Sequence, residues 1–140
     1  MLPPVAALAA APGGAVLLTP DGEIESLSLP QAARHVRGAE PPMVCHARAV
    51  AARLRTEAFP AFDLLELFAF IRPAQFCVPT PRGLAEALKL PAPRNHEEEA
   101  ETLPAAARAL LEELATRFPR LHPSKQSDLK GIAWVMAKGG

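Results

Sequence analysis

The chain has 140 residues, 49% of them apolar, and its fifteen Lys and Arg residues balance fifteen Asp and Glu residues. This length suits one domain that buries about two-thirds of the surface exposed by the unfolded chain. Zero net charge excludes phosphate binding driven by bulk positive charge, although a local basic patch stays open. No apolar run is long enough for a membrane span, and the opening MLPPVAALAAAPGG lacks the basic residues of a signal peptide. We therefore expect a cytoplasmic protein without a membrane partner.

The first half of the chain carries strand signals. Residues 15–19 (AVLLT) and 23–29 (EIESLSL) flank Pro20-Asp21-Gly22, which predicts a hairpin turn between two strands. A short helix is expected at residues 31–36, after a proline suited to a first helical position. Residues 43–46 form a compact apolar run of the kind found in buried strands. About three strands are therefore expected.

The second half is predominantly helical in pattern. Helices are expected at residues 47–55, 62–71 and 84–90, the second of them apolar around most of its circumference. Asn95 is a good N-cap for a further helix. Pro104 cannot donate a backbone hydrogen bond, so we expect a break or kink there.

The last residues predict one more helix, from Ser127 or Asp128 to about Lys138. Trp134 and Val135 would place large apolar groups outside its main apolar face. Because a terminal helix rarely exposes so much apolar area, we expect it to meet further protein beyond Gly139-Gly140.

The cysteines and histidines give no metal-site pattern. Two lone thiols without C-x-x-C spacing are typical of core residues. The histidines have no i,i+4 spacing, and together with the cysteines they fit no zinc pattern; these residues are Cys45, Cys77, His35, His46, His96 and His122.

Four segments in this order carry a resemblance to a known family: PMVCHARAVAARL, FPAFDLLELFAFIRP, PTPRGLAEALKLP and NHEEEAE. They resemble the DnaQ-like (DEDD) 3′–5′ exonuclease domain, in the degenerate form at the head of some bacterial DinG-like DNA helicases. The resemblance implies a trimmed α/β fold of the ribonuclease H-like kind. It also implies two divalent ions held by four carboxylates in active members.

The resemblance places the active-site positions on residues that have mostly lost their acids. The strand-to-helix segment matches at His46, but five residues later the expected acid is Ala51. The family's His-x4-Asp falls on His96 and Glu101. Residues 15–19, expected as the first strand, carry no Asp-x-Glu pair. We therefore expect no catalytic residue and no metal site, these four positions being vestigial.

Two readings of the charged residues stay open. Asp21 and Glu23 could form a shifted metal pair with His96 and Glu101, in an active Mg²⁺-dependent exonuclease, although a simple turn explains Asp21 better. Basic residues of the predicted 47–55 helix could instead hold a DNA backbone without cutting it. These candidates for DNA contact are Arg48, Arg53 and Arg55.

The function expected from the resemblance is that of a non-catalytic accessory domain of a DinG-like helicase acting in DNA repair. Its partners would be DNA and the downstream helicase domains of the same polypeptide. The parent would use ATP, whereas this chain contains no G-x-x-x-x-G-K-[ST] and no cofactor site. The expected organisation is an extension at residues 1–14, the exonuclease-like domain at 15–120, and a linker with a terminal helix at 121–140. A protein-interaction module without nucleic-acid contact is the third alternative.

Overall fold

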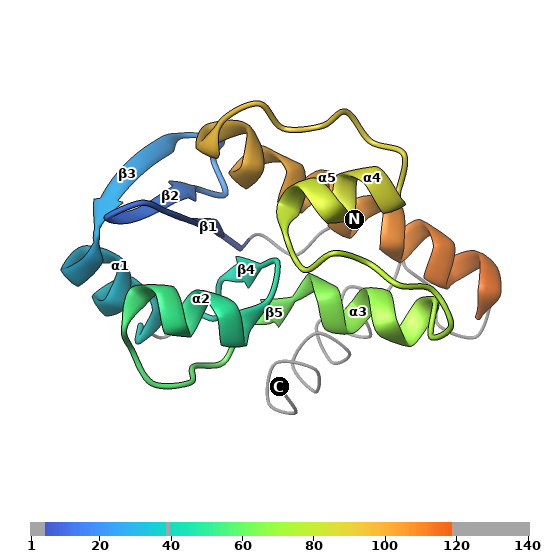
Figure 1. The fold of residues 1–140 in the computed structure, drawn as a ribbon, viewed down its shortest axis with the longest axis horizontal. Helices are drawn as coiled ribbons and strands as arrows, with labels where there is room; N and C mark the ends of the chain where they lie inside the picture. Colours follow the sequence, from blue (N-terminus) through green and yellow to red (C-terminus); the bar gives the residue numbers. More distant parts are fainter. Residues whose placement is uncertain (1–4, 39, 119–140) are drawn as a thin grey trace.

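A computed structural model describes residues 5–38 and 40–118, which form one mixed sheet with helices on both faces (Figure 1). The strands follow the order β3-β2-β1-β4-β5. Strand β2 is antiparallel to β1 and β3, whereas β4 is parallel to β1 and β5 is parallel to β4. The strands are β1 (Ala7–Ala11), β2 (Gly14–Leu18), β3 (Ile24–Ser28), β4 (Met43–Val44) and β5 (Phe62–Asp63). The predicted α/β class is thus confirmed.

The sheet has five strands rather than about three because two of them gave no clear sequence signal. β1 lies within residues 1–14, which were expected to form an extension, yet it is the middle strand of the sheet. Its sequence, ALAAA, lacks the β-branched and aromatic residues that favour strands. β5 occupies the first two residues of the predicted 62–71 helix. The boundary expected at residue 15 therefore does not separate β1 from the sheet.

Within the described residues, five helices follow from local capping and apolar patterns. Side chains of Ser28, Asp63, Thr80 and Asn95 accept a backbone N–H at the start of four of them, as N-caps do. The helices predicted at 31–36, 47–55, 62–71 and 84–90 are all present with shifted ends. Their bounds are α1 (Leu29–Val36), α2 (Ala47–Leu54), α3 (Leu64–Ile71), α4 (Pro81–Ala87) and α5 (His96–Arg117).

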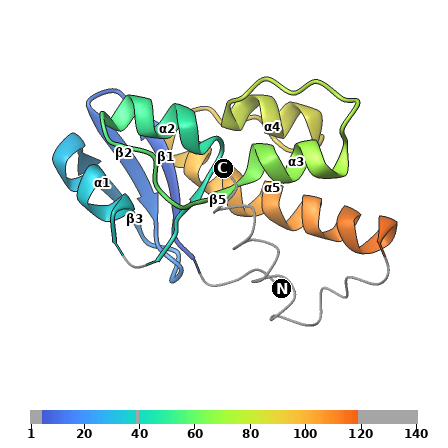
Figure 2. The same cartoon turned by 90° about the horizontal axis from the view of Figure 1, so that it is seen from below.

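The helices form two layers around the sheet (Figures 1 and 2). Leu8 of β1 faces α1 and α2, in a buried cluster with Val36 and Val50. Its neighbours Ala7 and Ala9 face the opposite layer, which α3, α4 and α5 form. This alternation is what a strand covered on both faces requires. The small side chains of β1 thus lie at the centre of the molecule.

Helix α5 corrects the prediction of a break at Pro104, because it runs from His96 to Arg117 through the proline. An interior proline costs a helix about 3 kcal/mol. Leu103, Leu110 and Leu114 are almost completely buried on the same helix. Each such side chain contributes about 1.5–3 kcal/mol on burial, so packing outweighs the proline.

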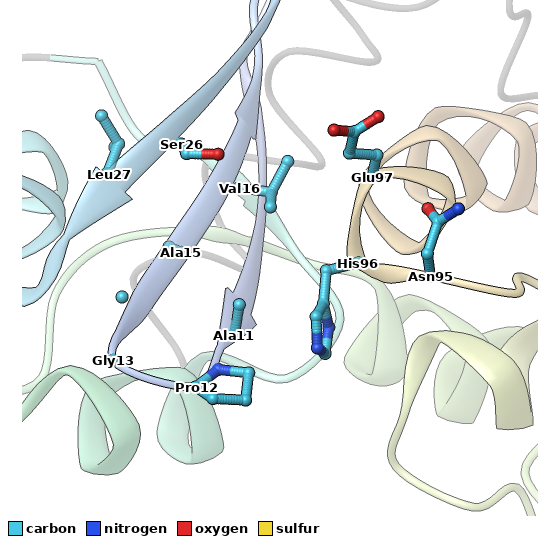
Figure 3. Close-up of a pocket in the computed structure, with 11 residues that line it drawn as sticks. Ala11, Pro12, Gly13, Ala15, Val16, Ser26, Leu27, Asn95, His96 and Glu97 are labelled. Atoms are coloured by element: carbon cyan, nitrogen blue, oxygen red, sulfur yellow. The ribbon is translucent and has the colours of Figure 1, made fainter.

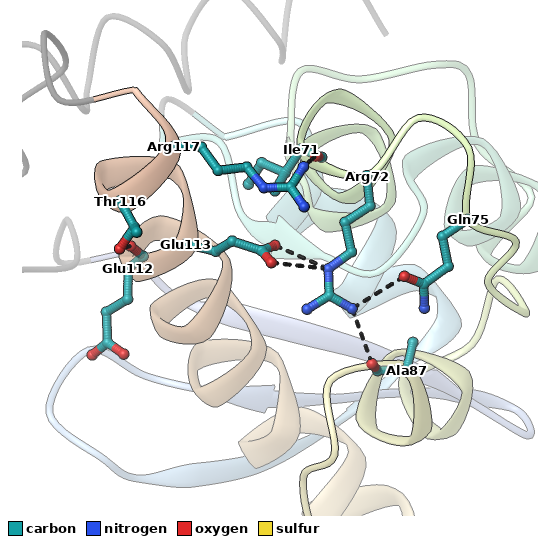
Figure 4. A network of polar contacts seen from close by, with 8 residues as sticks. All are labelled: Ile71, Arg72, Gln75, Ala87, Glu112, Glu113, Thr116 and Arg117. Atoms are coloured by element: carbon teal, nitrogen blue, oxygen red, sulfur yellow. Dashed lines mark hydrogen bonds and ion pairs between the residues drawn. The ribbon is translucent and has the colours of Figure 1, made fainter.

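A polar network fixes the ends of the α3–α4–α5 layer (Figure 4). The Nε of Arg72 donates to Oε2 of Glu113 at 2.9 Å, and its Nη1 donates to the carbonyl of Ala87 at 3.2 Å. Arg117 donates to the carbonyl of Ile71. One arginine after α3 therefore joins α4 to α5.

Some sequence expectations fall on residues that the structure does not describe. The helix expected from Ser127 or Asp128 to Lys138, with Trp134, lies outside the described residues, as does the 121–140 linker. Among residues 5–38 and 40–118, none of the helices has the length and apolar character needed to cross a bilayer.

Candidate functional site

The parallel strands β1, β4 and β5 end at the same edge of the sheet, at Ala11, Val44 and Asp63. In open α/β sheets, ligands bind in the crevice outside the carboxyl ends of the strands. Two pockets open at this edge, with volumes of 640 Å³ and 380 Å³. The candidate site therefore lies at this edge.

The smaller pocket lies between α2, the end of β1 and the start of α5. Its apolar floor includes Ala9 and Ala10 of β1. Its polar lining comes from three separate segments, and consists of His46, Arg53, Thr80, His96 and Glu99. The larger pocket lies between the β1–β2 turn, β3 and the start of α5 (Figure 3).

His96 lines both pockets, at the carboxyl end of β1. Figure 3 shows its ring beside Ala11 and Pro12, with Glu97 on the far side of the helix start. We call the smaller pocket the strand-end groove, defined by the residues that line it. It brings His46 and Arg53 of the α2 segment together with His96 of α5.

A buried aspartate that the sequence analysis did not select organises one side of the groove. Asp63 is 3% exposed; its Oδ2 accepts the N–H of Ala47 at 2.8 Å, and its Oδ1 accepts that of Glu66 at 3.0 Å. The same Oδ2 lies 3.5 Å from Nδ1 of His46. Asp63 thus begins two helices and places His46. The signal was present, because an acid directly before an apolar helix and three residues before Glu66 resembles an N-cap.

Burial disfavours the thiolate form of Cys45, the residue directly before His46. The pKa of Cys45 rises to about 12, first because the thiol is buried and then because the charges of Asp63, Cys77 and Glu99 disfavour a thiolate. Burial, with Asp63, also raises the pKa of Glu66, and His46 opposes this shift. A nucleophilic cysteine needs a lowered pKa, so Cys45 does not fit that role.

The vestigial positions do not assemble as the resemblance implies. His96 pairs through Nδ1 with Glu99 at 2.6 Å, whereas Glu101 is exposed and lines neither pocket. Asp21 and Glu23 lie exposed at the β2–β3 turn and line neither pocket. The four side chains of the exonuclease alternative therefore do not share one site.

The central strand itself carries no acid where it meets the groove. β1, and not residues 15–19, is the first strand, and it ends in Ala9-Ala10-Ala11. Ala51 is buried in the cluster between α1, α2 and the sheet, and it does not line the groove. Within the described part of the chain, no three His, Cys, Asp or Glu side chains gather as metal ligands. These residues do not fit the two-ion site that the exonuclease family implies.

The three candidate arginines occupy different surroundings. Arg53 lines the smaller pocket. Arg48 and Arg55 are exposed and line neither pocket, and Arg55 ends α2 in a left-handed conformation with φ of 55°. One arginine therefore lies in the groove, and two lie on the helix beside it.

No family model, curated protein or solved structure matches this chain. The chemistry of the groove therefore rests on its own lining: Arg53, two histidines near carboxylates, and a floor of small apolar residues. Arginine can bind a phosphate without assistance from a metal ion. The lining thus places one cation, Arg53, in the same pocket as the carboxylate of Glu99.

Proposed function

We propose that the chain is a ribonuclease H-like domain without a hydrolytic centre, and that it contacts DNA as an accessory domain of a DinG-like helicase. The observation that carries this proposal is the strand-end groove. Its floor at the end of the central strand is alanine, and Arg53, His46 and His96 surround it. The chain thus offers a place for a phosphate backbone where an exonuclease would hold its cations.

The strand arrangement supports the finer fold assignment. An antiparallel meander of β3, β2 and β1 continues into the parallel strands β4 and β5. This arrangement agrees with the ribonuclease H-like fold that the resemblance implies. The β4–α2 junction at His46 lies at the carboxyl edge, where that family places a site residue.

The link to a helicase rests on the order of the four resembling segments. Its implied partners are DNA and the downstream helicase domains of the same polypeptide, and ATP would be used by those domains alone. Sequencing the gene beyond the codon for Gly140 tests this part. A downstream G-x-x-x-x-G-K-[ST] would support it, and a stop codon directly after Gly140 would contradict it.

The central experiment measures binding and cleavage of one labelled single-stranded oligonucleotide by the full chain. We expect fluorescence anisotropy to show weak binding that falls with salt and is equal in EDTA and in Mg²⁺. We expect no release of nucleotides with Mg²⁺ or Mn²⁺. Metal-dependent release that His96→Ala abolishes would replace the proposal with the exonuclease alternative.

A matched pair of arginine variants locates the contact. Arg53→Ala should weaken binding about fivefold, because one phosphate contact is lost. The slope of the logarithm of the binding constant against the logarithm of salt concentration should become shallower by about 0.7. Arg34→Ala is the control, because Arg34 is exposed on α1 and lines neither pocket. Equal losses in both variants would place the contact outside the groove, and complete absence of binding would refute the DNA part of the proposal.

A further inference from the structure

Strand β3 forms an edge of the sheet, next to β2 alone. Among the described residues, no segment pairs with its outer side. Four of its five residues are exposed, and the fifth, Leu27, is half-buried. In Figure 1 the strand lies at the rim of the molecule, away from α3 and α4. Its outer backbone is therefore accessible to another chain.

The hydrogen-bond pattern shows which backbone groups of β3 are directed outward. The N–H of Thr19 donates to the carbonyl of Glu23 at 2.8 Å, so these residues form a bonded pair. Bonded and non-bonded pairs alternate along an antiparallel ladder, so Glu25 also bonds to β2. Ile24 and Ser26 occupy the non-bonded pairs and direct their N–H and C=O groups away from β2. These four groups can receive a further strand.

The edge lacks three features that commonly block strand addition, namely lysine, proline and a bulge. Natural edges are protected by lysine, proline or bulges. β3 contains no lysine or proline, and its five residues pair with β2 without a bulge. One face of the edge is also open: Ile24 is 38% exposed, and Ser26 lines the larger pocket. An added strand would cover both side chains.

Charge selects the kind of strand that this edge can accept. Asp21, Glu23 and Glu25 are all exposed on the β2–β3 hairpin. Two copies paired edge to edge would bring six carboxylates to one seam, which disfavours self-association. Glu97 adds a further acid across the larger pocket. A basic strand would instead place opposite charges beside these carboxylates, and DNA would be repelled.

We propose that the outer edge of β3 binds an extended segment of a partner protein as a sixth strand. The segment alternates basic and apolar side chains, since successive residues of a strand point to opposite faces. Its basic residues lie beside Glu23 and Glu25, and its apolar residues cover Ile24. Main-chain hydrogen bonds to Ile24 and Ser26 hold it, as in other cases of strand addition. This surface is separate from the contact proposed for Arg53.

The test uses the full chain and a fluorescein-labelled peptide that alternates Lys and Val over seven residues. We expect the peptide to bind and a matched peptide that alternates Glu and Val not to bind. Hydrogen exchange followed by NMR supplies a second readout. The amides of Ile24 and Ser26 should exchange more slowly when the Lys–Val peptide is present, whereas that of Glu25 should change little because β2 already protects it.

Two variants at one position separate strand addition from general charge attraction. Ser26→Pro removes an outward N–H without removing a bond to β2, and proline is tolerated at such edge positions. It should weaken peptide binding about tenfold, whereas Ser26→Thr should change it less than about twofold. Glu25→Lys, an exposed change that leaves the backbone intact, should transfer binding from the Lys–Val to the Glu–Val peptide.

Several results would overturn the inference. These are failure of the Lys–Val peptide to bind, equal binding by Ser26→Pro and Ser26→Thr, and unchanged exchange at Ile24. Self-association of the chain with protection of Ile24 would also overturn it, because a second copy would then occupy the edge. Failure here leaves the DNA proposal intact, since Arg53→Ala should affect only oligonucleotide binding and Ser26→Pro only peptide binding.

Discussion

Replacing Asp63 with alanine should destabilise the protein more than any surface change at the groove. The carboxylate begins α3 by accepting the N–H of Glu66, and losing such a cap costs about 1 kcal/mol. It also accepts the partly buried N–H of Ala47, and leaving that donor without a partner costs about 1–3 kcal/mol. The free energy of unfolding should therefore fall by about 2–4 kcal/mol, which is roughly 7–14 °C in melting temperature for this length.

Urea unfolding followed by circular dichroism measures this loss, and Asp63→Asn is the matched control. Asparagine keeps one oxygen that can accept the N–H of Glu66, but its amide nitrogen cannot accept that of Ala47. About half of the loss should therefore remain. In Asp63→Asn the pKa of Cys45 should also fall, because the carboxylate charge that raises it is removed.

A loss below about 1 kcal/mol in Asp63→Ala would refute this reasoning, because it would mean that neither N–H depends on the carboxylate. Equal losses in the alanine and asparagine variants would refute the assignment of one oxygen to each helix. An unchanged slope of unfolding free energy against urea is required in both cases, since a change would indicate an altered denatured state.

Three further changes test the fold. Because the pKa of Cys45 is raised from 9.0 to about 12, its stabilising contribution should be present below pH 9 and lost towards pH 12, in a pH series of urea unfolding. Gly14→Ala should prevent folding, as judged by circular dichroism, because the new Cβ would lie 1.9 Å from the carbonyl oxygen of Leu27. Pro104→Ala should stabilise α5 by about 1–3 kcal/mol in urea unfolding, because a donor for the carbonyl of Ala100 is restored.

Each of these predictions has a control and a contrary outcome. Cys45→Ala should remove the loss of stability between pH 9 and pH 12. The same loss in this variant as in the original protein would contradict its assignment to Cys45. In Gly13→Ala the new Cβ would meet open space, and only the positive φ of 73° disfavours alanine. This variant should therefore fold, with a free energy of unfolding lower by about 1 kcal/mol. Similar behaviour of both glycine variants would contradict the close approach at Gly14. A destabilised Pro104→Ala would show that the neighbouring helix turn is built around the proline.

The parts of the fold that the sequence predicted are those with local signals. Pro20-Asp21-Gly22 marked the β2–β3 hairpin, and Asn95 marked the start of α5. β1 was missed because its alanines give no strand preference by themselves, and only burial between two helical layers makes them a strand. Helix α5 also continues through Pro104 because of its packing, which helix propensities of single residues do not include.

In the groove, too, single residues could be predicted from the sequence, but the contacts between distant segments could not. His46 and His96 could be selected from the sequence, but their shared pocket depends on contacts between segments fifty residues apart. Glu99, rather than Glu101, pairs with His96 because a spacing of three residues places side chains on one helix face. Asp63 had a visible cap signal, but its bond to Ala47 required the tertiary fold.

Ala9, at the centre of β1, lies where only a small side chain fits. Ala9 is 3% exposed and packs with Val16 and Ala100, the latter fully buried on α5. An aspartate at position 9 would crowd Ala100 of α5, and overpacking of this kind costs about 1–3 kcal/mol. One substitution to an acid there should therefore destabilise the domain. A larger side chain at this place would require α5 to lie further from the sheet.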